Sequence, residues 1–75
     1  MNFDAELDVR GMNCPLPILR TKKTLAVMES GKILRVLATD RGAIRDFQAF
    51  SKQTGNELVS FSEQEERLEF LIRKR

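Results

Sequence analysis

Residues 7–18 read LDVRGMNCPLPI and join two segments of different hydrophobic periodicity. At the start of this stretch, apolar and polar residues alternate over residues 5–9, which predicts a half-buried strand. After it, apolar residues recur at helical spacing, which predicts a helix over residues 15–29. The stretch therefore leads from a strand directly into a helix, and it contains the single cysteine of the chain.

Cys14 directly precedes the predicted helix. Pro15 suits the first helical position because its φ is already helical, and Pro17 falls within the first turn, where backbone N–H groups lack helical partners. The partial positive charge of a helix N-terminus favours a thiolate. Arg10 and Arg20 lie close in sequence and would add to this effect if they reach the thiol, which the sequence leaves open. These features predict a nucleophilic Cys14 with a lowered pKa. A buried, inert thiol stays open as the alternative.

The length of 75 residues allows one domain, 1–75, with one modest core. With 41% hydrophobic and 32% charged residues, the composition is that of a folded globular domain and not of a disordered chain. A chain of this size has no room for a deep pocket that encloses both a large substrate and a cofactor. We therefore expect it to act through an exposed group or a surface.

The charged residues narrow the function classes further. Thirteen basic and eleven acidic residues give a net charge of +2 without a strong basic cluster, which disfavours direct nucleic-acid binding. One cysteine and no histidine exclude an internal disulfide and leave no set of soft ligands for a zinc site within one chain. No stretch resembles a secretory signal or is long enough to span a membrane, so we expect a cytoplasmic protein.

The remaining periodicity predicts a strand over residues 32–39, a helix over residues 41–54, and strands over residues 57–62 and 67–73. The order is therefore βαβαββ. The first two strands, joined through a helix, are expected to be parallel, and the last two form a hairpin around the polar turn at residues 62–66. We expect both helices to cover the same face of the sheet.

Several single residues have expected structural roles. Gly11 permits a tight turn after the first strand, and Gly31 is expected in the left-handed conformation just beyond the first helix. Asp40 is a reasonable N-cap for the second helix, which would explain it without any function. Arg35 is expected as a single cation on the open face of the sheet. The apolar residues of that face, which would form a partner surface if exposed together, are Ile33, Leu37, Val59 and Leu71.

Residues 7–17, with Cys-Pro-x-Pro after a strand and a glycine, resemble the signature of the TusA family of small sulfur-carrier proteins, also called SirA-like. The resemblance covers nearly the whole chain and includes Asp40, Arg45-Asp46 and Phe50. It implies an α+β two-layer sandwich, with two helices packed on one face of a four-stranded mixed sheet.

The resemblance also implies that Cys14 accepts a persulfide sulfur. The candidate site residues are Cys14 as sulfur acceptor and donor, Gly11, Pro15 and Pro17 for its position, and Arg10, Asp40 and Arg45 for partner contact or electrostatics. Four positions depart from the family pattern: Leu16, where the tRNA-thiolation carriers are acidic; Arg41, where they have proline; Ser51, where some members have a second cysteine; and Asn56, where many have histidine. These departures leave the pathway open among tRNA thiolation, cofactor assembly, sulfur oxidation and selenium metabolism.

The first functional hypothesis is a persulfide relay of the sulfurtransferase type. Cys14 would accept sulfane sulfur from a cysteine desulfurase or rhodanese-type donor and pass it to an acceptor protein, with no bound cofactor. The alternative is a non-catalytic regulatory or interaction module that binds RNA or a protein partner, because the expected architecture resembles the C-terminal domain of a translation initiation factor. A thiol–disulfide oxidoreductase is disfavoured, because the chain has no Cys-x-x-Cys pair.

Overall fold

The computed structural model describes residues 2–75. Within them the elements follow in the order β1 (Ala5–Asp8), α1 (Leu16–Ala26), β2 (Ile33–Ala38), α2 (Gly42–Thr54), β3 (Glu57–Gln64) and β4 (Arg67–Arg73). This is the predicted order βαβαββ.

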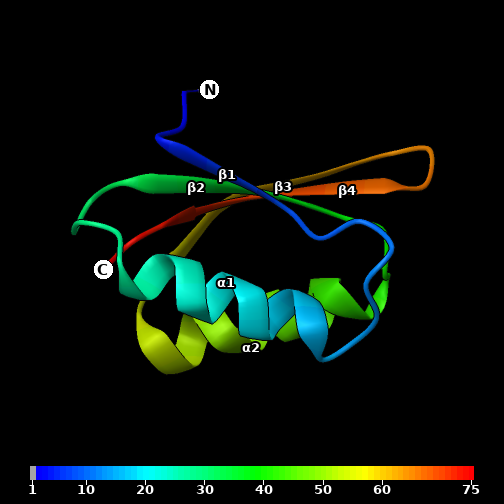
Figure 1. Ribbon diagram of the computed structural model, residues 1–75, viewed down its shortest axis with the longest axis horizontal. Helices are drawn as coiled ribbons and strands as arrows, with labels where there is room; N and C mark the ends of the chain where they lie inside the picture. The colour runs from blue at the N-terminus through cyan, green and yellow to red at the C-terminus, as the bar shows by residue number, and fades with distance from the viewer. Residues whose placement is uncertain (1) are drawn as a thin grey trace.

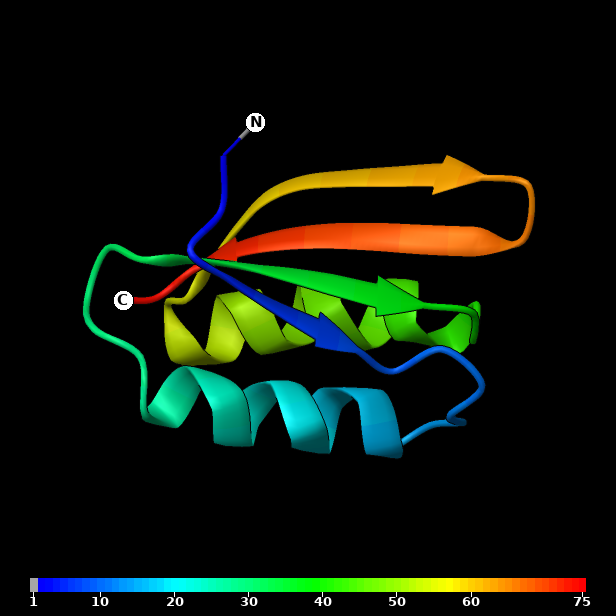
Figure 2. The same ribbon diagram turned by 45° about the horizontal axis from the view of Figure 1, so that its top comes forward.

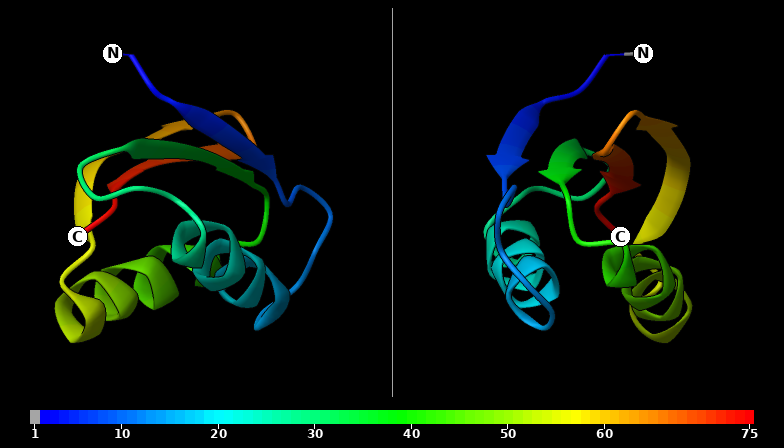
Figure 3. Two further views of the ribbon diagram at one scale, coloured as in Figure 1. Left: turned by 60° about the vertical axis from the view of Figure 1, so that its left-hand side comes forward. Right: turned by 90° about the vertical axis from the view of Figure 1, so that its right-hand side faces the viewer.

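The strands form one mixed sheet in the order β1-β2-β4-β3. β1 and β2 are parallel, whereas β4 pairs antiparallel with both β2 and β3. Both helices pack on the same face of this sheet, and the end-on view in Figure 3 shows them side by side beneath it (Figures 1 and 3). The predicted fold class, an α+β two-layer sandwich, is therefore confirmed.

Both helices begin at the same end of the molecule (Figure 2). The cause is the parallel pairing of β1 and β2, because each of these strands is followed by a helix that returns across the sheet. The loop after β1 and the loop after β2 therefore meet at one edge of the sheet. Residues more than twenty positions apart in sequence lie together there, and this edge holds the candidate site.

The core lies between the sheet and the two helices. Phe70 of β4 is at its centre, with the ring of Phe47 from α2 stacked on it at 4.3 Å and the ring of Phe61 from β3 at 5.2 Å. This aromatic packing attaches α2 to the sheet beyond what area burial alone provides. The buried core residues are Val9, Leu25, Leu34, Val36, Ala38, Ala43, Phe47, Phe50, Leu68, Phe70 and Ile72.

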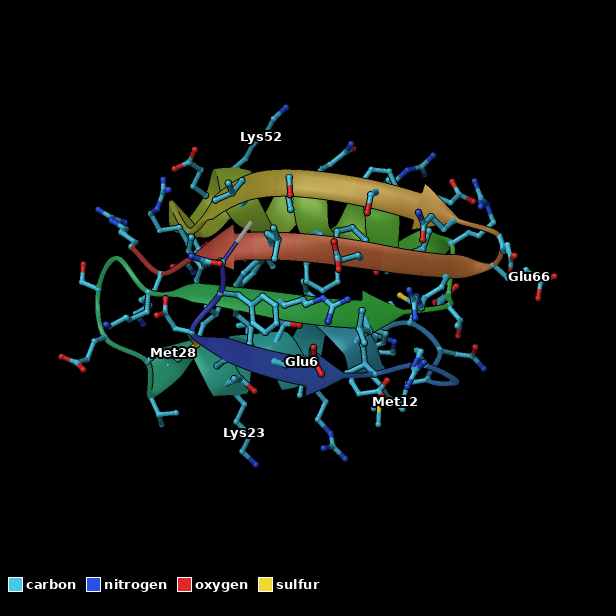
Figure 4. The ribbon with its side chains drawn as sticks, turned by 90° about the horizontal axis from the view of Figure 1, so that it is seen from above. Glu6, Met12, Lys23, Met28, Lys52 and Glu66 are labelled. Atoms are coloured by element: carbon cyan, nitrogen blue, oxygen red, sulfur yellow. The ribbon has the colours of Figure 1, made fainter. Side chains whose placement is uncertain are left out.

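The open face of the sheet carries a cluster of charged residues that was not predicted. Arg35 is not an isolated cation there, because it pairs with Glu6 of β1 at 2.6 Å and with Glu69 of β4 at 2.5 Å. Figure 4 looks onto this face, with Glu6 labelled. Leu37 and Leu71 retain only 6% and 5% exposure. The two leucines of this face are therefore covered, whereas Ile33 and Val59 are half-buried, so the four residues are not exposed together as a partner surface would require.

The first helix is shorter than the predicted 15–29. It ends at Ala26, where the N–H of Val27 bonds to the carbonyl of Thr24 and that of Met28 to the carbonyl of Leu25, so the last turn is tightened. Met28 then packs against the core from outside the helix. Gly31 does take a positive φ, of 86°, but in the following loop and not as the residue that ends the helix.

The hairpin is also tighter than predicted. β3 extends to Gln64, which leaves only Glu65 and Glu66 between the strands, and Glu65 takes a φ of 57°. The predicted turn over residues 62–66 was too wide because its polar residues lie on an exposed edge strand, where polarity does not distinguish strand from turn. The tip of this hairpin, with Glu66, extends beyond the helices (Figures 1 and 4).

Among residues 2–75, no helix combines the length and the apolar character that crossing a membrane requires.

Leu34→Ala should lower the free energy of unfolding by about 2–5 kcal/mol, because it removes buried methyl groups and leaves a cavity. Leu34 of β2 is 0% exposed, and urea denaturation measures the loss of stability. Leu19→Ala is the matched control, since it removes the same atoms from a side chain that is 50% exposed on α1. Its expected effect is within about 0.5 kcal/mol. Equal losses for the two variants would contradict this assignment of the core.

Candidate functional site

Cys14 is exposed in the loop between β1 and α1, at the end of the molecule where both helices begin (Figure 2). Its peptide bond to Pro15 is cis. Pro15 occupies the N-cap position of α1 and not the predicted first helical position, so the thiol stands just outside the helix. Pro17 is buried within the first turn, as its place in the sequence predicted. The alternative of a buried Cys14 is therefore wrong, because its side chain is exposed.

Asp40 fixes the backbone of this loop. Its Oδ2 accepts a hydrogen bond from the N–H of Cys14 at 2.7 Å, and its Oδ1 accepts one from the N–H of Gly42 at 3.1 Å. One carboxylate thus ties the Cys14 loop to the first residue of α2. The N-cap position of α2 belongs to Arg41, one residue later than predicted, but Asp40 still satisfies a free N–H group at the start of the helix.

Asp46 of α2 contacts the sulfur itself. The thiol of Cys14 donates a hydrogen bond to Oδ2 of Asp46 over an Sγ–Oδ2 distance of 3.0 Å. This hydrogen bond, together with partial desolvation and the negative charges of Asp46 and Asp40, raises the pKa of Cys14. The predicted lowering of the pKa is therefore wrong in direction.

The helix N-terminus offers the thiol few backbone donors. Pro15 and Pro17 have no N–H group, and the N–H of Leu16 donates instead to the carbonyl of Asn13 at 2.9 Å. The N–H of Leu19 donates to the carbonyl of Pro15 at 3.1 Å. The prolines that brace the turn thus remove donors on which the predicted activation depended, and the neighbouring carboxylates determine the electrostatics.

Arg10 is engaged elsewhere. Its guanidinium binds Asp8 through two hydrogen bonds of 2.9 and 2.8 Å, and this ion pair lowers the pKa of Asp8 to about 2. Any stability gained from the pair is present above the ordinary carboxyl pKa and is lost as the pH falls through about 2. Neither Arg10 nor Arg20 is among the causes of the shifted pKa of Cys14, which answers the question that the sequence left open for these two cations.

Gly11 shapes the turn that brings Cys14 across to α2. It takes a φ of 83°, which L side chains rarely adopt, and its N–H donates to Oγ1 of Thr39 at 2.9 Å. Thr39 and Asp40 are consecutive residues after β2, so both ends of the Cys14 loop are attached to the same short segment. The loop geometry therefore depends on contacts that only the folded sheet provides.

Two depressions adjoin Cys14, and Asp46 lines both of them. One follows the first turns of α2 and includes Arg41 and Arg45. The other runs between α1 and α2 and includes Leu19 and Lys22. The structure thus brings Cys14, Asp40 and Arg45 together at one edge. Pro15 lines the second depression with Cys14, and Pro17 is buried in the first turn of α1. Arg10 lines a separate depression beside the hairpin turn.

Sequence reasoning did not assign Asp46 a role, although a signal was present. Ala43, Asp46, Phe47 and Phe50 have the i, i+3, i+4, i+7 spacing of one helical face. A carboxylate on an otherwise apolar face indicates a specific partner, which the structure identifies as the thiol of Cys14. Within residues 2–75, no group of three or more histidine, cysteine, aspartate or glutamate side chains is arranged to hold a metal ion.

The sequence model of the family described as "Sulfurtransferase TusA" matches residues 5–74, which is nearly the whole chain. The chain belongs to the TusA family. One relative, the sulfur carrier protein TusA of Allochromatium vinosum, is 59% identical over 73 residues, which are 97% of this chain and 96% of the relative.

Other members of the TusA family agree with this match. The putative sulfur carrier protein YrkI of Bacillus subtilis is 46% identical over 74 residues and covers 99% of both chains. Among solved structures, the SirA-like protein from Desulfitobacterium hafniense superposes with a TM-score of 0.82 at 26% identity, over 93% of this chain and 96% of the other. The two-layer fold is thus shared with a SirA-like protein of known structure.

Asp40→Ala should lower the free energy of unfolding by about 1–2 kcal/mol, because two backbone N–H groups lose a charged acceptor. It should also speed amide hydrogen exchange at Cys14 and Gly42, which NMR measures residue by residue.

Asp4→Ala is the matched control, since Oδ2 of Asp4 accepts a hydrogen bond from the N–H of Ile33 at 2.8 Å, on another part of the sheet. A similar loss of stability is expected there, without faster exchange at Cys14. Unchanged exchange at Cys14 in Asp40→Ala would show that Asp40 does not hold the loop.

Proposed function

We propose that this protein is a sulfur carrier that accepts sulfane sulfur on Cys14 and hands it to a second protein. The observation that carries the proposal is the exposed thiol of Cys14, on the Cys-Pro-x-Pro turn of a TusA-family chain. Relatives covering nearly the whole chain bear the name sulfur carrier protein, which supports the same role here. Gly11, Pro15 and Pro17 are proposed to hold the turn that presents the sulfur.

The proposed relay consists of two thiol exchange reactions. The Cys14 thiolate attacks the outer sulfur of a donor persulfide, so that a new S–S bond forms at Cys14 and the donor cysteine leaves as a thiolate. A thiolate of the acceptor protein then attacks the outer sulfur on Cys14. Cys14 leaves as a thiolate and takes up a proton from solvent. One sulfur atom enters and one leaves, and neither step requires a bound cofactor.

The proposed partners are a cysteine desulfurase or rhodanese-type donor and an acceptor protein with a reactive cysteine. α1 carries Arg20, Lys22 and Lys23 and no acidic residue, and Lys22 lines one of the depressions beside Cys14. Arg45 adds a cation from α2, and none of these four forms an ion pair within residues 2–75. We propose that Arg45 and Asp40 contact these partners beside Cys14, and that Arg10, paired with Asp8, contacts them from the loop after β1.

Incubation with a cysteine desulfurase, its pyridoxal cofactor and cysteine should add the mass of one sulfur atom to Cys14. Mass spectrometry of the intact protein and of its alkylated peptides measures the addition. Cys14→Ser should show none, because it lacks the accepting sulfur. If the unchanged protein acquires no sulfur from either a desulfurase or a rhodanese-type donor, the proposed relay is wrong.

The same variant separates the relay from the alternative of a binding module. A module that acts by binding RNA or a protein would keep that binding in Cys14→Ser, and RNA binding would weaken steeply with added salt. Salt-sensitive RNA binding by both forms, without sulfur loading of the unchanged protein, would favour the alternative.

Arg45→Gln should slow sulfur transfer from a loaded donor about two- to fivefold, the equivalent of one exposed charge pair of up to ~1 kcal/mol. The reason is the position of Arg45 beside Cys14, where its charge attracts an anionic persulfide. Rapid-quench mass spectrometry of Cys14 measures the rate. Lys52→Gln is the control, because it removes the same charge from the last turn of α2 (Figure 4). Equal slowing by both variants would indicate a general charge effect and contradict a contact role for Arg45.

A further inference from the structure

We infer that Asp46 is a positioning residue that holds the unloaded Cys14 as a protonated thiol, so that the free carrier is kept unreactive between transfers. This inference deepens the proposed sulfur relay and rests on it for its biological meaning. The chemical effect of Asp46 on the thiol, however, stands on the geometry of these two residues.

The geometry is that of a thiol donor and a carboxylate acceptor. Sγ of Cys14 lies 3.0 Å from Oδ2 of Asp46, and the hydrogen bond requires the proton to be on sulfur. Loss of that proton would place two negative charges at hydrogen-bond distance, which disfavours the thiolate. Asp46 is half-buried on α2, so its carboxylate has less freedom to move than that of a fully exposed side chain.

Four other charged side chains lie near Cys14. Asp40, from the loop after β2, adds a second negative charge and acts in the same direction. Arg41 and Arg45 of α2 line one adjoining depression, and Lys22 of α1 lines the other. These three cations are not among the causes of the shifted pKa of Cys14. That pKa is raised, and its causes are Asp46, desolvation and Asp40.

Protonation has a direct consequence for side reactions. The thiolate is the nucleophile that reacts with oxidants and alkylating agents, so a thiol held by Asp46 is protected while no partner is bound. Once Cys14 carries the outer sulfur, Sγ has no proton and this hydrogen bond is lost. The carboxylate of Asp46 then faces the persulfide, and repulsion of an ionised persulfide favours its release to the acceptor. Asp46 would thus stabilise the empty carrier and not the loaded one.

The test is the pH dependence of Cys14 alkylation by iodoacetamide, a neutral reagent that is not steered by charge. Asp46→Asn should move the rate profile to lower pH and raise the rate at neutral pH several-fold, because the carboxylate charge is gone. The plateau at high pH should be equal or lower, since a thiolate of lower pKa is intrinsically less nucleophilic. Glu66→Gln is the matched control, because it removes the same charge at the tip of the hairpin (Figure 4) and should leave the profile unchanged.

An unshifted profile in Asp46→Asn, with native circular dichroism, would overturn the inference. Asp46→Ala, which suits a helix, replaces that variant if it does not fold. Sulfur loading is measured separately on the same proteins. If the unchanged protein does not load while Asp46→Asn still shifts the profile, the proposed relay fails and the effect of Asp46 on the thiol stands. If loading occurs and the profile does not shift, the relay stands and the role of Asp46 fails.

Discussion

One carboxylate, that of Asp40, holds the candidate site together. It accepts hydrogen bonds from the backbone of Cys14, 26 residues away in sequence, and from the first residue of α2. Without it, the loop after β1 would be attached to the rest of this edge by fewer contacts, chiefly the Gly11–Thr39 hydrogen bond. A carboxylate that binds two N–H groups is a strong acceptor and cannot easily be replaced by a neutral side chain. The position of the sulfur is therefore decided by a residue that does not touch it.

The sheet makes this contact possible. Parallel pairing of β1 with β2 brings the ends of both strands to one edge, and Asp40 follows β2 directly. The antiparallel strand β4 then buries the other side of β2, so that β2 is an interior strand with little freedom to shift register. Phe70 on β4 packs against Phe47 of α2, on the same helix as Asp46. The core thus positions both carboxylates that face Cys14, one through β2 and the other through α2.

The sequence was a good guide to the elements and a poor guide to the electrostatics of the site. Alternation and helical spacing report which faces are buried, so the order βαβαββ and the position of both helices on one face could be predicted. The end of α1 could not, because Val27 and Met28 continue the apolar pattern while the backbone has already left the helix. The pairing of Arg10 with Asp8, and not with Cys14, depends on the direction of side chains in a turn. Helical spacing places Asp46 on an apolar face, but its partner depends on how the loop before α1 lies against α2, which no local pattern contains.

The raised pKa of Cys14 shows that the chemistry of a sequence motif depends on the residues that surround it in the fold. A cysteine at the start of a helix is ordinarily stabilised as a thiolate by free N–H groups, but two prolines and a bond to Asn13 remove several of them here. What remains near the sulfur is the charge of Asp46 and Asp40, which acts in the opposite direction. A carrier must meet its donor and its acceptor in separate encounters, and a thiolate exposed in the interval would be open to oxidation. For such a protein, a rigid and accessible thiol that keeps its proton is better suited to the interval between encounters than a permanently ionised one.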